Sequence, residues 1–127
     1  MAAVVHLDTH VVIWIKTAQN RLPPAVRRQL NEKQCLISPA VQLELQFLHE
    51  IGRLRPAASD LVRELSTKMG LQLDTTPFVQ VMERALDWPW TRDPFDRLIC
   101  AQSLAADAPL LTRDETIRSR LPLAMWD

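Results

Sequence analysis

The chain has 127 residues, of which 47% are hydrophobic and 24% are charged, as in an ordinary globular protein with a core of its own. Its fifteen basic and fifteen acidic residues cancel, which excludes a protein that binds nucleic acid through a large positive charge alone. No apolar run approaches the roughly 20 residues that span a bilayer, and the N-terminus lacks the pattern of a signal peptide. We therefore expect a single domain over residues 1–127, located in the cytoplasm.

The first half of the chain alternates short apolar runs with segments of helical periodicity. The expected elements are a strand over 3–7, a helix over 9–17, a helix over 23–33, a strand over 35–37 and a helix from Ser38 to about Gly52. The first strand is almost wholly apolar, as expected for a strand buried on both faces. Ser38 and Pro39 suit the N-cap and first position of their helix.

The second half continues the alternation. The expected elements are a helix over 57–69, a strand over 71–73, a helix from Pro77 to about Leu86, a loop over 87–92, a helix from Asp93 to Ala106, a strand over 109–111, a short helix from Thr112 and a fifth strand over 123–125. This order predicts an α/β fold in which helices flank a central parallel sheet of four to five strands.

Four carboxylates recur at or near the junctions between these elements. Asp8 and Asp114 each follow an apolar strand, Asp96 lies in the first turn of a helix, and Glu44 lies inside the helix after the second strand. In an open parallel sheet, the turns that follow the strands gather along one edge. Carboxylates gathered there repel one another unless a cation joins them. The sequence therefore predicts a divalent metal site and favours phosphodiester chemistry.

Most of these carboxylates also have an ordinary structural explanation. Asp8 can cap the helix that follows it, and Glu44 can be a surface residue, although no Lys or Arg stands four positions away to pair with it. Thr112 and Glu115 have the spacing of a capping box, which leaves Asp114 free to act elsewhere.

The segment that begins at Asp93 is a helix start in its own right. Asp93 suits the N-cap, Pro94 the first position and Asp96 the third. One of the two acids can cap the helix while the other faces the site. We favour Asp96 for the site, because it extends the apolar stripe through Ile99 and Leu104.

The histidines and cysteines contribute less. His6 and His10 lie near Asp8, but no further His or Cys stands at the spacing of a zinc site, so we expect core or supporting histidines. An oxygen-only ligand set suits Mg²⁺ or Mn²⁺ instead. Cys35 and Cys100 are far apart in apolar surroundings, and we expect buried thiols.

The remaining charged and aromatic residues leave room for a local nucleic-acid surface. Once four carboxylates are gathered on a metal ion, the rest of the surface is net positive, and its arginines outnumber its lysines. Arginine makes forked contacts to phosphate. The four tryptophans could stack on RNA bases, but we expect them to pack in the core or between subunits.

Four stretches of the chain carry a family resemblance. They are residues 7–14, residues 37–39 with Glu44 and Leu45, residues 92–102, and residues 110–114. In these stretches the chain resembles the PIN-domain family, most closely the toxin ribonucleases of VapBC-type toxin–antitoxin pairs. The order, the spacing and the total length agree over essentially the whole chain, and residues 93–102 are the most specific part.

The resemblance implies a PIN-like fold and a ribonuclease that depends on Mg²⁺ or Mn²⁺. The family's acidic quartet falls on Asp8, Glu44, Asp96 and Asp114, with Asp8 and Asp96 as the principal metal ligands. Supporting or capping positions fall on Thr9, Asp93 and Thr112. In the family a metal-activated water cleaves the RNA backbone. The resemblance also implies a homodimer that is inhibited by a cognate antitoxin protein.

Two other functions stay open. A phosphatase or phosphotransfer domain would use Asp8 as its nucleophile, but position 10 is His where a haloacid-type phosphatase needs a second acid, and Leu7 precedes Asp8 where a receiver domain needs adjacent acids. A catalytically silent PIN-like module would bind RNA or protein without turnover. All four acids are present, which argues against that loss and favours the ribonuclease.

Overall fold

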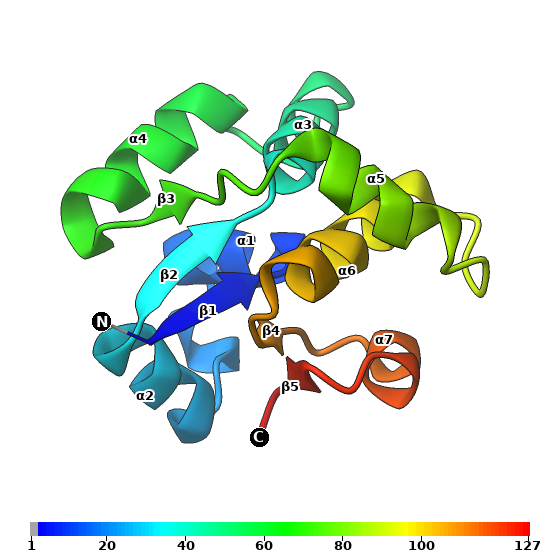
Figure 1. The fold of residues 1–127 in the computed structure, drawn as a ribbon. Helices are drawn as coiled ribbons and strands as arrows, with labels where there is room; N and C mark the ends of the chain where they lie inside the picture. Colours follow the sequence, from blue (N-terminus) through cyan, green and yellow to red (C-terminus); the bar gives the residue numbers. More distant parts are fainter. Residues whose placement is uncertain (1–2) are drawn as a thin grey trace.

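The computed structural model describes residues 3–127, which form a five-stranded parallel sheet flanked by helices (Figure 1). The strands are β1 (Val4–Leu7), β2 (Gln34–Ile37), β3 (Gln72–Leu73), β4 (Leu110–Leu111) and β5 (Ala124–Met125). The helices are α1 (Thr9–Thr17), α2 (Pro24–Glu32), α3 (Pro39–Glu50), α4 (Ala58–Met69), α5 (Phe78–Leu86), α6 (Pro94–Ala106) and α7 (Glu115–Arg120), with a 3-10 turn, η1 (Gln19–Arg21), after α1. The strand order β3-β2-β1-β4-β5 places β1 at the centre.

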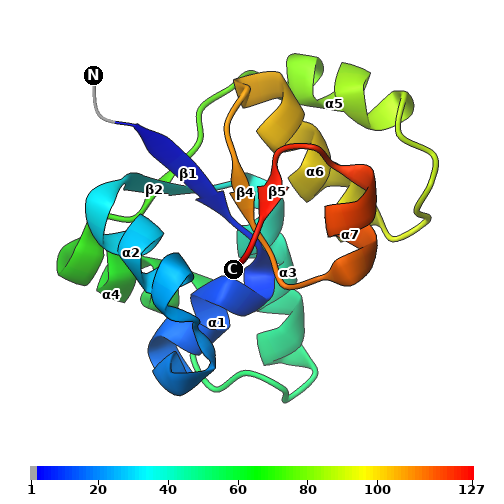
Figure 2. The same cartoon turned by 90° about the horizontal axis from the view of Figure 1, so that it is seen from below.

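The predicted α/β fold with a parallel sheet is confirmed. Figure 2 shows α1 and α6 on opposite sides of the strands, so the central strand is covered on both faces. Val5 and Leu7 on one face of β1 and His6 on the other are accordingly buried. Each predicted helix and strand is present, with ends that move by a few residues, and the turn η1 is an addition that the sequence pattern did not indicate.

The start of α7 corrects one expectation. The helix begins at Glu115 rather than Thr112, because Asp114 is its N-cap and accepts a hydrogen bond at Oδ1 from the backbone N of Ile117 at 2.9 Å. The predicted capping box of Thr112 with Glu115 is therefore wrong. Thr112 instead extends the sheet, since its backbone N donates to the carbonyl of Met125 at 3.1 Å.

Backbone hydrogen bonds align the carboxyl ends of the strands at one edge of the sheet. The backbone N of Asp8 donates to the carbonyl of Leu111 at 3.0 Å, and that of Asp74 donates to the carbonyl of Ile37 at 2.9 Å. Asp8 follows β1, Asp74 follows β3 and Thr112 follows β4. The polar residues after these strands are thus brought to the same edge.

His6 and the two cysteines lie in the core of the protein. His6 is buried, with its Nε2 2.9 Å from Oδ2 of Asp74, and burial lowers the pKa of His6 although Asp74 opposes the shift. Cys35 and Cys100 are buried thiols, as expected.

None of the helices within residues 3–127 combines the length and the apolar character needed to cross a bilayer.

Candidate functional site

The buried Asp8 carboxylate lies at the carboxyl-end edge of the sheet and is held by two hydrogen bonds. Its side chain is 6% exposed. Oδ1 accepts from the backbone N of Thr9 at 2.8 Å, and Oδ2 accepts from the hydroxyl of Thr112 at 2.7 Å. The first bond caps α1, and the second joins the end of β1 to the end of β4. One orientation of the carboxylate is therefore strongly favoured.

Thr112 connects two of the four acids. Its hydroxyl donates to Asp8 and also accepts a hydrogen bond from the backbone N of Asp114 at 3.1 Å. The side chain is completely buried, so water cannot replace either bond. Thr112 therefore joins the end of β1 to the turn that carries Asp114.

Glu44 reaches the same neighbourhood from α3. Its Oε1 accepts a hydrogen bond from the hydroxyl of Thr9, which directly follows Asp8. Glu44 is half-buried, and burial is the main reason why its pKa is raised. Asp8 and Asp93 raise the pKa further, while the Thr9 hydrogen bond opposes the shift. The charges of two other carboxylates therefore act on Glu44.

The charges of the other acids all act on Asp96. Burial, followed by the charges of four other carboxylates, raises its pKa to about 7. These carboxylates, in decreasing order of effect, belong to Asp8, Asp93, Asp114 and Glu44. Their shared influence places all the predicted site acids in one electrostatic neighbourhood.

Asp93 has a structural task at the start of α6. Its Oδ1 accepts hydrogen bonds from the backbone N of Phe95 at 2.9 Å and of Asp96 at 3.1 Å. It is exposed, whereas Asp96 is half-buried and lies one helical turn before the buried Cys100. The cap thereby fixes the turn of helix that carries Asp96.

Within residues 3–127, no three Asp, Glu, His or Cys side chains are close enough, as they are oriented, to hold one ion between them. The reason is visible at each acid: Asp8, Asp93 and Asp114 are bonded to helix N-termini, and Glu44 is bonded to Thr9. As a set of carboxylate oxygens, the cluster nevertheless fits the ligand preference of Mg²⁺ or Mn²⁺.

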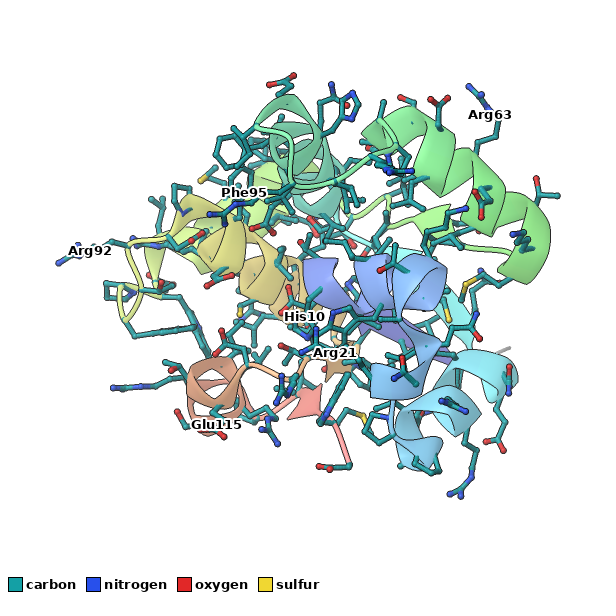
Figure 3. All side chains as sticks on the ribbon, turned by 180° about the vertical axis from the view of Figure 1, so that it is seen from behind. His10, Arg21, Arg63, Arg92, Phe95 and Glu115 are labelled. Atoms are coloured by element: carbon teal, nitrogen blue, oxygen red, sulfur yellow. The ribbon has the colours of Figure 1, made fainter. Side chains whose placement is uncertain are left out.

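His10 lies between the acids and an aromatic, basic patch. Its Nδ1 is 3.5 Å from Oδ2 of Asp8, and its Nε2 accepts a hydrogen bond from the backbone N of Arg113 at 2.9 Å. Burial lowers the pKa of His10; Asp8 and Asp114 oppose this shift, and Arg113 and Arg21 add to it. Figure 3 shows His10 and Arg21 close together.

The sequence patterns did not predict that Arg21 and Gln102 lie in the region of the site. Arg21 arrives through the turn η1, for which the sequence has no strong local signal. Gln102 is buried, and its Oε1 accepts a hydrogen bond from the hydroxyl of Ser38 at 2.9 Å, which ties the start of α3 to α6. Its place in the most specific stretch, residues 93–102, was the available signal.

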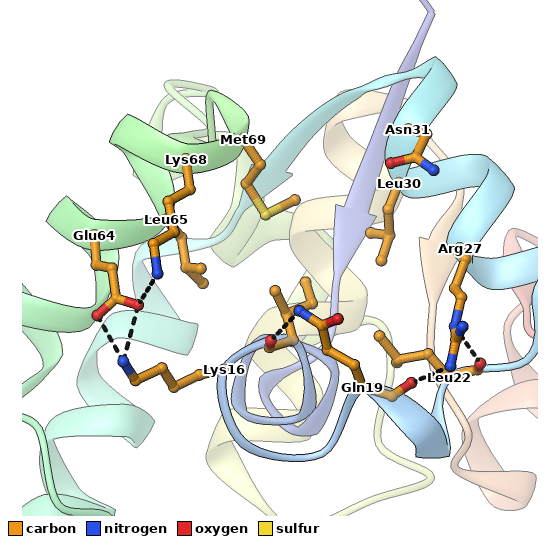
Figure 4. A pocket seen from close by; sticks show the side chains of 11 residues that line it. Lys16, Gln19, Leu22, Arg27, Leu30, Asn31, Glu64, Leu65, Lys68 and Met69 are labelled. Atoms are coloured by element: carbon orange, nitrogen blue, oxygen red, sulfur yellow. Dashed lines mark hydrogen bonds and ion pairs between the residues drawn. The ribbon is translucent and has the colours of Figure 1, made fainter.

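A hollow of about 400 Å³ lies apart from the acids, among α1, α2 and α4 (Figure 4). Its one acid, Glu64, accepts hydrogen bonds from Lys16 at 2.9 Å and from Lys68 at 3.0 Å. The two ammonium groups neutralise that carboxylate. This hollow therefore lacks the accumulation of negative charge that marks the edge of the sheet.

Comparison with known proteins gives consistent matches. The model of the PIN domain family matches residues 5–120. Ribonuclease VapC22 of Mycobacterium tuberculosis (strain ATCC 25618 / H37Rv) is 30% identical over 126 residues, which cover 94% of this chain and 96% of that protein.

Solved structures share the fold at low sequence identity. The chain is similar to VapBC2 from Rickettsia felis bound to a promoter DNA fragment, with a TM-score of 0.68, 16% identity and coverage of 98% of this chain and 99% of that one. It is also similar to VapBC-1 from nontypeable Haemophilus influenzae, with a TM-score of 0.71, 15% identity and coverage of 98% and 96%.

Proposed function

The chain belongs to the PIN domain family, and on that premise we propose that it is a metal-dependent endoribonuclease, the toxin of a type II toxin–antitoxin pair. The observation that carries the proposal is the set of hydrogen bonds at the sheet edge: Thr112 bonds Asp8 and the backbone of Asp114, and Thr9, next to Asp8, bonds Glu44. Negative charge gathered at one sheet edge is costly without a cation, and it is useful with one. The name of the relative from Mycobacterium tuberculosis, a ribonuclease, supports RNA as the substrate.

The residues that would hold Mg²⁺ or Mn²⁺ are Asp8, Glu44, Asp96 and Asp114. Bound there, the ion would supply an activated water and neutralise charge on a phosphoryl oxygen. Thr112 keeps Asp8 and the Asp114 turn in register, and Thr9 holds Glu44 beside them. These bonds fix the acids before the substrate arrives, which is the contribution that the protein makes to such a site.

The proposed reaction is hydrolysis of a phosphodiester bond by water. Water attacks phosphorus, one P–O ester bond breaks, and the two fragments carry a phosphate at one new end and a hydroxyl at the other. The ribose 2′-hydroxyl is not the nucleophile, so no 2′,3′-cyclic phosphate is expected at the fragment ends.

We further propose one PIN domain over residues 1–127, a cytoplasmic location and two protein partners, a second copy of the chain and a cognate antitoxin. The similarity to VapBC complexes supports the antitoxin. Exposed apolar side chains at two helices that pack against α6 support a protein partner: Leu43 and Phe47 on α3 with Ile51 at its C-cap, and Phe78, Val79 and Leu86 on α5. Leu43, Phe47 and Ile51 are four residues apart and form one stripe.

The phosphotransfer alternative is disfavoured by the surroundings of Asp8. Both of its oxygens accept hydrogen bonds, and its side chain is only 6% exposed. Attack on phosphorus needs an oxygen with open in-line access, whereas a metal ligand needs only a free lone pair, which a carboxylate oxygen with one hydrogen bond keeps. Trapping of a phosphoryl group on Asp8 by an acyl-phosphate donor would revive that alternative.

The test is cleavage of a mixed cellular RNA pool by the purified protein with Mg²⁺, with Mn²⁺ and with EDTA. We expect cleavage that requires the metal, leaves no cyclic phosphate and disappears in Asp96→Asn. The matched control is Asp60→Asn, which removes an exposed acid of α4. Equal cleavage by Asp96→Asn would refute the assigned site. A folded, metal-binding protein that cuts no RNA and causes no growth arrest in cells would instead be a silent binding module.

A further inference from the structure

Beside the acids lies a group of aromatic and basic side chains that take no part in the proposed metal-dependent hydrolysis. We call Trp14, Arg21 and Arg113 the basic shelf. The guanidinium carbon of Arg21 lies 4.3 Å from the ring centroid of Trp14, and that of Arg113 lies 5.8 Å from it. Both distances are in the range of cation–π contacts. A single tryptophan ring thus holds two positive charges near each other, although like charges repel.

The indole of Trp14 is itself held by its neighbours. The ring centroid of His10 is 4.9 Å away and that of Trp126 is 6.1 Å away. Trp126 is buried, so this side of the platform is part of the core. Trp14, the aromatic platform of the basic shelf, is therefore held in place by its neighbours in the fold.

The two arginines of the basic shelf are free to bind an anion. Both are exposed, and in the part of the chain that the structure describes neither forms an ion pair with Asp or Glu. A guanidinium that lies over an aromatic ring keeps its N–H edge available for a forked contact with phosphate.

The basic shelf borders the carboxylate cluster. Arg113 stands between Thr112 and Asp114 in sequence, and the charges of Asp8, Asp114, Arg113 and Arg21 all act on His10. An open pocket of about 360 Å³ lies here, lined by His10, Trp14, Arg113, Asp114 and Glu115. Because Asp114 and Glu115 are acidic, an anion in this region is favoured only on the side of the arginines.

We propose that Arg21 and Arg113, positioned by Trp14, bind a backbone phosphate of the RNA strand beside the phosphate that is cleaved. This proposal rests on the proposed ribonuclease function and adds the surface that receives the strand. A cluster of carboxylates repels RNA, so a strand needs compensating positive charge close to the point of cleavage. Contacts to phosphate orient the strand without reading its sequence.

The experiment measures binding of a short fluorescein-labelled single-stranded RNA by fluorescence anisotropy. All proteins carry Asp96→Asn, so that the RNA stays intact. Arg21→Gln and Arg113→Gln are each added to this background, and Arg63→Gln is the matched control, since Arg63 is an exposed arginine of α4 far from His10 (Figure 3). We expect each shelf variant to raise Kd about fivefold and to lower the slope of log K against log salt by about 0.7, while the control leaves both unchanged.

Two further variants separate binding from folding. Arg21→Lys keeps the charge without the fork and should lie between the parent and Arg21→Gln. Trp14→Leu should weaken RNA binding because both arginines lose their platform, and a thermal unfolding curve shows whether that variant is still folded. The shelf arginines are exposed, so their variants should unfold at the parent temperature.

Each contrary outcome has a distinct meaning. Shelf variants that bind RNA with the same Kd and salt dependence as the Arg63→Gln control would overturn the shelf proposal and leave the ribonuclease intact. Shelf variants that keep RNA binding and lose binding to the antitoxin would show a protein contact instead, and would also overturn it. If the Asp96→Asn parent does not bind RNA and the wild type does not cut it, the proposed function fails and the shelf proposal fails with it.

Discussion

A single hydroxyl group, that of Thr112, connects two of the four proposed metal ligands. It donates to Asp8 and accepts from the backbone N of Asp114, and its side chain is fully buried. Thr112→Val keeps the shape and removes both hydrogen bonds. We expect the free energy of unfolding, measured with urea, to fall by about 1–3 kcal/mol, and metal-dependent cleavage to fall with it. Thr112→Ser should restore most of both, and equal loss in Ser and Val would contradict this role.

Asp96 makes the stability of the metal-free protein depend on pH. Its pKa is about 7 in the folded state, against an ordinary value of 3.8. The folded protein therefore binds this proton more tightly than the unfolded chain, and the associated stability is lost as pH rises towards and past 7. Between about pH 5 and pH 8 we expect a loss of about 1–2 kcal/mol, a figure reduced for the partial exposure of the site.

The difference between wild type and Asp96→Asn isolates this effect. His6 and His10 have lowered pKa values, so their contribution to stability runs the opposite way, but they are common to both proteins. In urea titrations with EDTA, Asp96→Asn should be at least as stable as wild type at the higher pH. A variant that is less stable than wild type there would mean that Asp96 is a structural residue rather than a strained ligand.

At the scale of the element, the first turn of α6 separates two acids by task. Asp93 accepts hydrogen bonds from two backbone N–H groups, and Asp96 faces the other carboxylates. Asp93→Ala should lower the free energy of unfolding by about 1 kcal/mol, as the loss of an N-cap does. Asp93→Asn keeps the capping oxygen and removes the charge, so it should retain both stability and cleavage. Loss of cleavage in Asp93→Asn, measured beside Asp96→Asn, would make Asp93 a ligand as well.

Helix and strand positions were predictable because their signals are local. Ser38 with Pro39, and Asp93 with Pro94, mark helix starts by the chemistry of neighbouring residues, and Gly70 ends α4 with a positive φ of 72°. The start of α7 was not predictable in this way. Thr112 and Asp114 both suit an N-cap, and the choice depends on a backbone bond from Thr112 to Met125 in the next strand.

The site follows the same division between local and distant contacts. Asp8, Asp96 and Asp114 could be proposed from the sequence because their positions at element junctions predict a common edge, and the family resemblance added support for Glu44, which lies inside a helix. The hydrogen bond between Ser38 and Gln102 joins residues 64 positions apart, and the contact of Arg21 with Trp14 depends on the turn η1. No local pattern encodes either contact, so the ties between elements and the basic shelf became visible only in the folded chain.

At the scale of the whole molecule, exposed apolar side chains on α3 and α5 predict self-association. Leu43 is 62% exposed and Val79 is 69% exposed, which is unfavourable for a chain that stays single in water. Leu43→Glu and Val79→Glu should each shift the mass measured by light scattering from dimer towards monomer, with little loss of stability, because neither residue is in the core. Ser59→Glu, an exposed position of α4, is the control. An unchanged mass in both variants would remove these helices from the dimer interface.

The metal site is tested most directly by measuring Mn²⁺ binding with isothermal titration calorimetry, near neutral pH and without RNA. If the carboxylates at the end of the sheet are gathered for a divalent ion, wild type binds Mn²⁺ saturably. Asp8→Asn and Asp96→Asn then lose that binding, while Asp60→Asn keeps it, because Asp60 is exposed on α4. A wild type that takes up no Mn²⁺, or an Asp96→Asn protein that binds it as wild type does, would contradict the assignment of these acids to a metal site.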